Sequence, residues 1–307
     1  MAAKASGVQR YIASAVWCLG QTYSQLGNCD MSYNHIQEAY WLFNTLPPGE
    51  VESQRLSSLC GIDLVEVCYT LQVDKVVALA WDVKKKCTAM LDDLIHGCSL
   101  LVLRKALYSA QQWQEALCYL SQARTMFKAI GNTFNLACAN QFISWVRYAE
   151  NRLPDVLDAI EEAWKYAELS TTRYIQISIS LDLGRIFFSA NQDTKAWKHL
   201  EIALTNASYI GHRIQVACTL EYMGYGYLCR GDYQNAYGAY EAAAEKYLGI
   251  VDDCFAERCK ENMARIERKQ GNLDTVIGFH RPPIDIDKTL FYTPVQALAS
   301  ELPIFHS

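Results

Sequence analysis

Two copies of one pattern lie end to end in this sequence of 307 residues. The first, residues 183–203, reads LGRIFFSANQDTKAWKHLEIA, and the second, residues 223–243, reads MGYGYLCRGDYQNAYGAYEAA. Gly224 and Ala236 in the second copy follow Gly184 and Ala196 in the first by forty residues. Apolar and small residues recur at intervals of three and four on both sides of a short polar turn, which is typical of a helical hairpin. Because one such hairpin cannot bury its apolar face alone, the repeat predicts a stack of hairpins.

The same register extends through most of the chain. Positions spaced by forty residues carry Ala116, Val156, Ala196, Ala236 and Val276. A copy near the N-terminus begins at Leu19-Gly20, and the next, over about 53–95, is degenerate but keeps two amphipathic stripes. We therefore expect residues 1–280 to form an all-α, right-handed solenoid of stacked helical hairpins, with about six repeats and a terminal half repeat.

The C-terminal residues 281–307 leave this period after Pro282-Pro283. Side chains such as Leu290, Phe291 and Phe305 make the segment too apolar for a free disordered tail. We expect it either to cap the last repeat, whose outer face has no neighbour, or to turn back into the concave face of the solenoid.

The pattern resembles the tetratricopeptide repeat (TPR), whose signature is Trp-x2-Leu-Gly-x2-Tyr followed by Ala, an aromatic residue and Ala. The forty-residue period is similar to that of the long-repeat branch: spindle adaptors of the LGN/Pins type, kinesin light chains and bacterial Rap-type peptide sensors. The joints at Ile130-Gly131-Asn132 and Ile210-Gly211-His212 are similar to the Ile-Gly-Asp joint of that branch. The resemblance implies a superhelix in which the first helix of each hairpin lines a concave binding surface.

On those first helices, three rows of positions are expected to face the concave side. The candidate peptide-binding residues there are Lys105, Tyr108, Gln141, Trp145, Tyr148, Arg185, Phe188, Glu221 and Tyr225. Aromatic and Arg side chains on a concave surface commonly anchor a partner. An alternative is that Tyr148 and Phe188 only pack between hairpins. The chain has Arg185 and Tyr225 where spindle adaptors and kinesin light chains usually carry a peptide-clamping Asn, so its mode of binding should differ from theirs.

Catalytic and cofactor motifs are absent from the sequence. The six His residues lack metal-ligand spacing, and there is neither a phosphate-binding GxxxxGK[ST] loop nor a GxSxG nucleophile elbow. The 12 Cys residues lack CxxC spacing and are expected to be structural thiols in a reducing compartment, with a redox-sensing thiol at Cys138 or Cys218 as the alternative. We therefore expect no enzyme activity, no cofactor and no metal site.

The net charge of −5, without a long run of one sign, gives no reason to expect nucleic acid or an anionic membrane as a partner. The short basic run at Lys84 to Lys86 is interpreted as a solvated helix face. The sequence thus predicts a cytoplasmic, non-catalytic scaffold, with a nuclear location not excluded, that binds a peptide or protein segment on its concave face. The alternative is an assembly module that self-associates through its end repeats, with the tail as a cap or an autoinhibitory segment.

Overall fold

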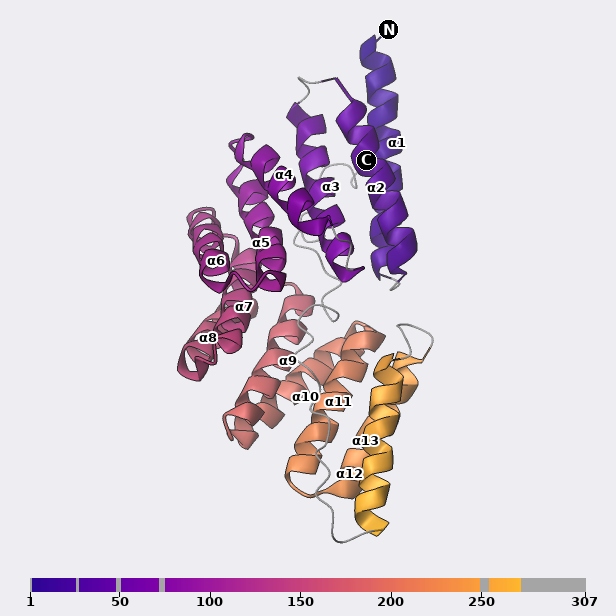
Figure 1. Cartoon of the computed structure of the whole chain (residues 1–307), viewed down its shortest axis with the longest axis vertical. Coiled ribbons are helices and arrows are strands. Elements are labelled where there is room, and N and C mark those ends of the chain that lie inside the picture. The colour runs from indigo at the N-terminus through magenta and orange to yellow at the C-terminus, as the bar shows by residue number, and fades with distance from the viewer. Residues whose placement is uncertain (1, 26–27, 48–50, 72–74, 249–253, 272–307) are drawn as a thin grey trace. The chain divides into compact units, whose positions relative to one another are not determined.

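The computed structural model describes residues 2–25, 28–47, 51–71, 75–248 and 254–271, and these residues are almost entirely helical (Figure 1). Within them lie thirteen helices: α1 (Ala2–Gln25), α2 (Cys29–Thr45), α3 (Val51–Thr70), α4 (Val76–Thr88), α5 (Asp93–Ser109), α6 (Trp113–Ala129), α7 (Thr133–Ala149), α8 (Leu153–Leu169), α9 (Arg173–Ser189), α10 (Asp193–Tyr209), α11 (Arg213–Cys229), α12 (Tyr233–Tyr247) and α13 (Cys254–Gly271). The predicted all-α fold of helical hairpins is confirmed. Val276 and the tail, residues 281–307, lie outside the described residues.

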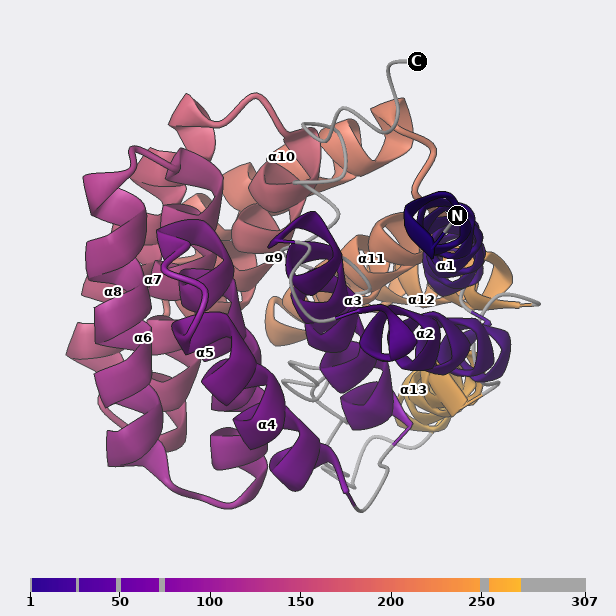
Figure 2. The same ribbon diagram turned by 90° about the horizontal axis from the view of Figure 1, so that it is seen from above.

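The helices form two compact units, one containing α1 to α7 and the other α8 to α13. Within each unit, neighbouring helices in the chain pack against each other, as α1–α2 and α11–α12 show in both views (Figure 1, Figure 2). The odd-numbered helices also contact one another, in the pairs α1–α3, α3–α5, α5–α7 and α9–α11. Odd-numbered helices such as α7, α9 and α11 are therefore buried on more than one side.

The joints between helices explain the forty-residue period. From α5 to α12, each helix starts twenty residues after the one before it, so a hairpin spans forty. At most joints one residue takes a left-handed conformation: Leu91, Gln111, Gly131, Asn151, Asn191, Gly211 and Gly231. At five of these joints, the residue after the left-handed one donates its backbone N–H to the carbonyl five residues back, as Asp232 does to Tyr227 at 2.9 Å. This is the Schellman arrangement, which pairs a carbonyl that the helix end would otherwise leave without a partner.

The joint between α8 and α9 is built differently. Ser170, the residue after α8, is extended, with φ −81° and ψ 137°. No residue of this joint has a positive φ. Instead, the side-chain amide of Gln176 donates to the carbonyls of Ala167 and Ser170, at 3.2 and 3.1 Å. A side chain from the following helix thus replaces the left-handed residue in closing this helix end.

The core follows the register of small residues. Ala116, Val156, Ala196 and Ala236 are all 0% exposed. A Cβ atom added to Gly184 would lie 2.6 Å from Leu200, and one added to Gly224 would lie 3.1 Å from Tyr240. Paired helices therefore approach closely at these positions, as predicted. Among the described residues, no helix is both long and apolar enough to cross a bilayer.

Candidate functional site

Among the described residues, buried charges lie on one class of helix. Six charged side chains are buried there, and all of them lie on odd-numbered helices: Asp63, Glu66, Arg104, Asp182, Arg185 and Glu221. Burial of a charge is costly unless it is paired and hydrogen-bonded. The even-numbered helices bury only apolar or hydroxyl side chains within the same ranges. The polar chemistry of the interior is therefore a property of the odd-numbered helices.

In the second unit, Glu221 on α11 is at the centre of a buried ion pair. Its carboxylate accepts hydrogen bonds from Arg258 Nε at 2.6 Å and Arg258 Nη2 at 2.7 Å, and the Tyr247 hydroxyl donates to it at 3.0 Å. Burial alone lowers the pKa of Arg258, but the hydrogen bonds to Glu221 raise it on balance. Because Glu221 is 1% exposed, this bidentate pair ties α11 to α13 away from solvent.

A second pair in the same unit lies on α9. Arg185 Nη2 is 3.2 Å from Asp182 Oδ1, and both side chains are less than a tenth exposed. The Arg185 guanidinium also lies 5.9 Å from the ring centroid of Tyr222 on α11. Burial raises the pKa of Tyr222 to about 12, although the neighbouring Arg185 opposes this rise. Arg185 thus links α9 to α11 through its contact with the Tyr222 ring, while its ion pair with Asp182 lies within α9.

Phe188 has a packing role in this unit. Its ring meets Trp197 of α10 edge to face, with the centroids 5.6 Å apart. A Cβ added to Gly226 of α11 would lie 2.4 Å from the Phe188 ring, so the glycine makes room for it. Tyr225, the next residue toward the N-terminus, remains partly exposed. Of the four candidates here, Tyr225 is therefore the most accessible to a partner.

In the first unit, Arg104 of α5 is stacked on aromatic rings of α7. Its guanidinium carbon is 3.0 Å from the ring centroid of Phe142 and 5.5 Å from that of Trp145. Trp145 is 3% exposed and Gln141, one turn earlier, is 1% exposed. An Arg on an aromatic face is a favourable contact when water is excluded. Arg104 was not among the predicted residues, because it occupies the position equivalent to Gly184 of the repeat.

The remaining candidates of this unit differ in exposure. Tyr108 and Tyr148 are partly exposed, and the Tyr108 ring meets Trp113 edge to face at 4.8 Å. Lys105 lies on α5, but its side chain is outside the part of the structure that is described. Asp63 on α3 accepts hydrogen bonds from Trp17 Nε1 and Gln21 Nε2, each at 2.8 Å. These contacts join α1 to α3 through a buried carboxylate.

The thiols and potential metal ligands show no activated group within the described residues. Burial raises the pKa of both Cys138 and Cys218 to about 12, whereas a reactive thiol needs a lowered pKa. The described part of the chain contains no cluster of three or more His, Cys, Asp or Glu side chains that could hold a metal ion. A redox-sensing role is therefore not favoured for Cys138 or Cys218, because neither thiol is activated.

The architecture is that of a TPR-like helical-repeat protein. A Rap protein complexed with competence and sporulation factor has a similar structure, with a TM-score of 0.62 and 13% identity over 86% of this chain and 76% of that chain. The Rap conjugation gene regulator of plasmid pLS20, in complex with the Phr* peptide, has a TM-score of 0.58 and 14% identity over 92% and 80%.

Aspartyl phosphate phosphatase F from Bacillus subtilis is also similar, with a TM-score of 0.56 and 10% identity over 90% of this chain and 75% of that chain. No protein-family model and no curated protein matches the sequence. At these low identities the similarities establish the fold, and the fold alone does not decide between binding and catalysis.

Proposed function

We propose that this protein is a non-catalytic scaffold that binds a peptide or protein segment through its odd-numbered helices. The observation that carries the proposal is the confinement of buried charged side chains to these helices. Folding alone would be served by apolar residues at such positions, since a buried ion pair often adds little net stability. Polar side chains that position a surface for a partner give a reason for that cost.

The nine predicted residues divide into two roles in this proposal. Tyr108, Tyr148 and Tyr225 are partly exposed and would contact the partner directly. Buried polar and aromatic side chains would fix the helices that carry them: Gln141, Trp145, Arg185, Phe188 and Glu221. Lys105 is retained as a contact residue from its place in the repeat. Tyr is well suited to anchoring because it offers a large rigid contact area and one polar atom.

Two further observations support this proposal. Solved proteins with a similar fold include Rap proteins in complex with competence and sporulation factor and with the Phr* peptide. The carboxylates of Asp182 and Glu221 are paired with arginine, which leaves them poorly suited to act as a general acid or base. A peptide is therefore the ligand that we propose for this protein. We propose no catalysed reaction for it, although aspartyl phosphate phosphatase F has a similar fold.

The assembly alternative also has an observation in its favour. On α1, Val8, Tyr11, Ile12 and Leu19 are each at least half exposed, at 60, 66, 51 and 50%, and share one face of the helix. An exposed apolar face of this kind commonly marks a protein interaction site. In this alternative a second copy of the chain would cover it, and the function would be self-assembly.

One experiment separates the two functions. The full chain is used to select peptides from a random library, and their affinities are measured for Tyr148→Ala, Tyr225→Ala and the control Tyr209→Ala. Tyr209 is 74% exposed on the even-numbered α10. We expect the first two variants to weaken binding by about 5- to 150-fold, as the loss of an anchor does, and the control to bind normally.

Peptides that bind all three variants equally would contradict the proposal. If, in addition, the chain associates in a concentration-dependent way and Tyr11→Glu abolishes that association, the assembly function is favoured. Analytical ultracentrifugation measures the association directly.

A further inference from the structure

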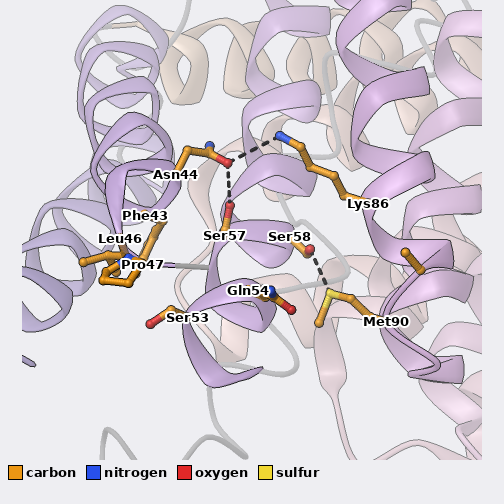
Figure 3. Close-up of a pocket in the computed structure, with 11 residues that line it drawn as sticks. Phe43, Asn44, Leu46, Pro47, Ser53, Gln54, Ser57, Ser58, Lys86 and Met90 are labelled. Carbon is orange, nitrogen blue, oxygen red and sulfur yellow. Dashed lines mark hydrogen bonds between the residues drawn. The ribbon is translucent and has the colours of Figure 1, made fainter. Parts of the chain in front are cut away.

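The first unit contains a pocket at the ends of α2 and α4 and the beginning of α3 (Figure 3). Its volume is about 330 Å³, which is within the range of sites that hold small molecules. None of the residues predicted for peptide binding lines it. The function of this pocket is therefore a separate question from that of the odd-numbered helices.

One wall of the pocket is a cluster of hydrogen-bond donors from three helices. Asn44, Ser57 and Lys86 point toward one another in Figure 3. Asn44 Oδ1 accepts from Lys86 Nζ at 3.4 Å and from Ser57 Oγ at 3.3 Å, and both distances are longer than an optimal hydrogen bond. Two donors thus converge on one neutral oxygen over long distances, and the shorter contacts of Lys86 are those with Tyr40 and Asp82.

The orientation of the Asn44 amide is fixed by its own helix. Asn44 Nδ2 donates to the Tyr40 carbonyl at 2.6 Å, which directs Oδ1 toward Lys86 and Ser57. Lys86 is also held in place, by the Tyr40 hydroxyl at 2.7 Å and by Asp82 at 3.0 Å. Its ammonium therefore stays at the rim of the pocket even when no ligand is bound. Binding of a ligand then costs little side-chain entropy.

The charge of the pocket favours an anion. Lys86 is the one charged residue among those that line it, and Asp82, its ion-pair partner, does not line it. Burial alone lowers the pKa of Lys86, but its bonds to Tyr40 and Asp82 raise it on balance, so the ammonium is charged at neutral pH. The hydroxyls of Ser53 and Ser58, both 3% exposed, add further polar atoms to the α3 wall.

Apolar side chains lie on two sides of the pocket. Phe43 and Leu46 from the end of α2 are 3 and 6% exposed, and the flexible side chain of Met90 lies across from them. Pro47 and Met90 are more exposed than Phe43 and Leu46, so they offer most of the apolar surface that a hydrocarbon chain or an aliphatic side chain would cover. Methionine adapts well to apolar ligands of different shape.

We propose that this pocket binds a small amphipathic carboxylate, with the carboxylate at Lys86, Ser57 and Asn44 and the apolar part against Phe43, Leu46 and Met90. A carboxylate oxygen replaces Asn44 Oδ1 as acceptor for the two donors and forms shorter, charge-assisted hydrogen bonds with them. The same chemistry is presented by a free carboxylic acid and by the C-terminal carboxylate of a peptide that ends in an aliphatic residue.

The test uses the full chain labelled with ¹³C at its methionine methyl groups, with hexanoate as the probe. The Met90 signal is assigned with Met90→Leu. We expect hexanoate to shift this signal with a Kd on the order of 1 mM, because so small a ligand makes few contacts. Hexan-1-ol, which lacks the charge, should bind at least about tenfold more weakly.

Lys86→Met should weaken hexanoate binding about tenfold or more, and Ser57→Ala by a few-fold, because each removes one donor to the carboxylate. Lys85→Met is the matched control, since Lys85 is exposed on the same helix and does not line the pocket. It should leave the affinity unchanged. Far-UV circular dichroism checks that every variant keeps its helix content.

A second comparison identifies the source of the carboxylate. N-acetyl-Ala-Leu and its C-terminal amide are titrated in the same way. Binding of the peptide acid but not of the amide assigns the pocket to chain ends, whereas binding of hexanoate alone assigns it to small acids. Equal affinities for hexanoate and hexan-1-ol, an equal loss in Lys85→Met and Lys86→Met, or no shift of Met90 with any acid would overturn the proposal.

Discussion

Replacement of Arg258 by Met tests the buried ion pair between α11 and α13. Glu221 is 1% exposed and receives two short hydrogen bonds from Arg258, at 2.6 and 2.7 Å. In Arg258→Met the carboxylate keeps its hydrogen bond from Tyr247, but it loses the cation that offsets its burial. Removal of one partner from a buried pair typically costs about 3–5 kcal/mol. That is a large part of the roughly 5–15 kcal/mol by which folded domains are stable.

The assay is urea unfolding followed by far-UV circular dichroism and by tryptophan fluorescence at neutral pH. Arg268→Met is the control, because Arg268 is exposed on the same helix and donates a hydrogen bond to the Ala264 carbonyl of that helix. We expect the control to change the free energy of unfolding by less than about 0.5 kcal/mol, as exposed substitutions usually do.

A double variant separates the lost attraction from the burial of an unpaired charge. The double variant Glu221→Leu, Arg258→Met removes both charges. Replacing a buried ion pair with apolar residues often changes the stability very little. The double variant should therefore be more stable than Arg258→Met alone. If Arg258→Met costs less than about 1 kcal/mol, or if the double variant is the less stable of the two, burial of an unpaired Glu221 charge is not what destabilises Arg258→Met.

Two further predictions concern the even-numbered helices. Burial, with smaller contributions from Lys198 and Lys195, lowers the pKa of His199 to about 4, so below pH 6.5 the unfolded chain takes up a proton that the folded chain resists. Allowing for the partial exposure of His199, unfolding titrations should show a loss of about 1–2 kcal/mol between pH 6.5 and 4, with less loss in His199→Leu; identical pH profiles would contradict this. Ala236→Asp should cost several kcal/mol, because the 0% exposed site would bury an unpaired charge. Gln234→Asp, on the exposed face of the same helix, should cost little in the same thermal melts, and equal losses would show that the register is wrong.

The register of the fold could be predicted because it depends on local chemistry. Small side chains at Ala116, Ala196 and Ala236 permit close approach of two helices, and their forty-residue spacing is visible in the sequence itself. Turn residues such as Gly231 mark the helix ends, because glycine readily takes the left-handed conformation found there. These signals need no knowledge of which helices meet in space.

The polar pairs could not be predicted in this way. The sequence placed Glu221 in a row of the concave surface, but it did not indicate that Glu221 pairs with Arg258, thirty-seven residues later on α13. The sequence of α13 carries only a weak repeat signal, so no spacing argument points to Arg258. The long side chains of Glu and Arg can reach partners on other helices. Which partner they meet depends on how the helices pack, and this is not visible in the sequence.

The third repeat illustrates a different difficulty. Arg104 occupies the position of Gly184 and Gly224, where a small residue is expected. A close helix contact lies about two turns earlier, at Gly97, where an added Cβ would lie 2.7 Å from the Phe127 ring. A large side chain at the usual position is therefore compatible with the hairpin, and it becomes available to stack on Phe142 of α7.

The twenty-residue spacing of the joints also determines which changes of length the chain can absorb. One residue inserted within a helix rotates everything that follows in it by about 100° and exchanges buried with exposed side chains. An insertion or deletion of forty residues, cut at Asn191 and Gly231 for instance, leaves every later helix in its original phase. The chain can therefore gain or lose whole hairpins far more easily than single residues. At the left-handed positions, such an exchange would not disturb the buried and exposed faces of the flanking helices.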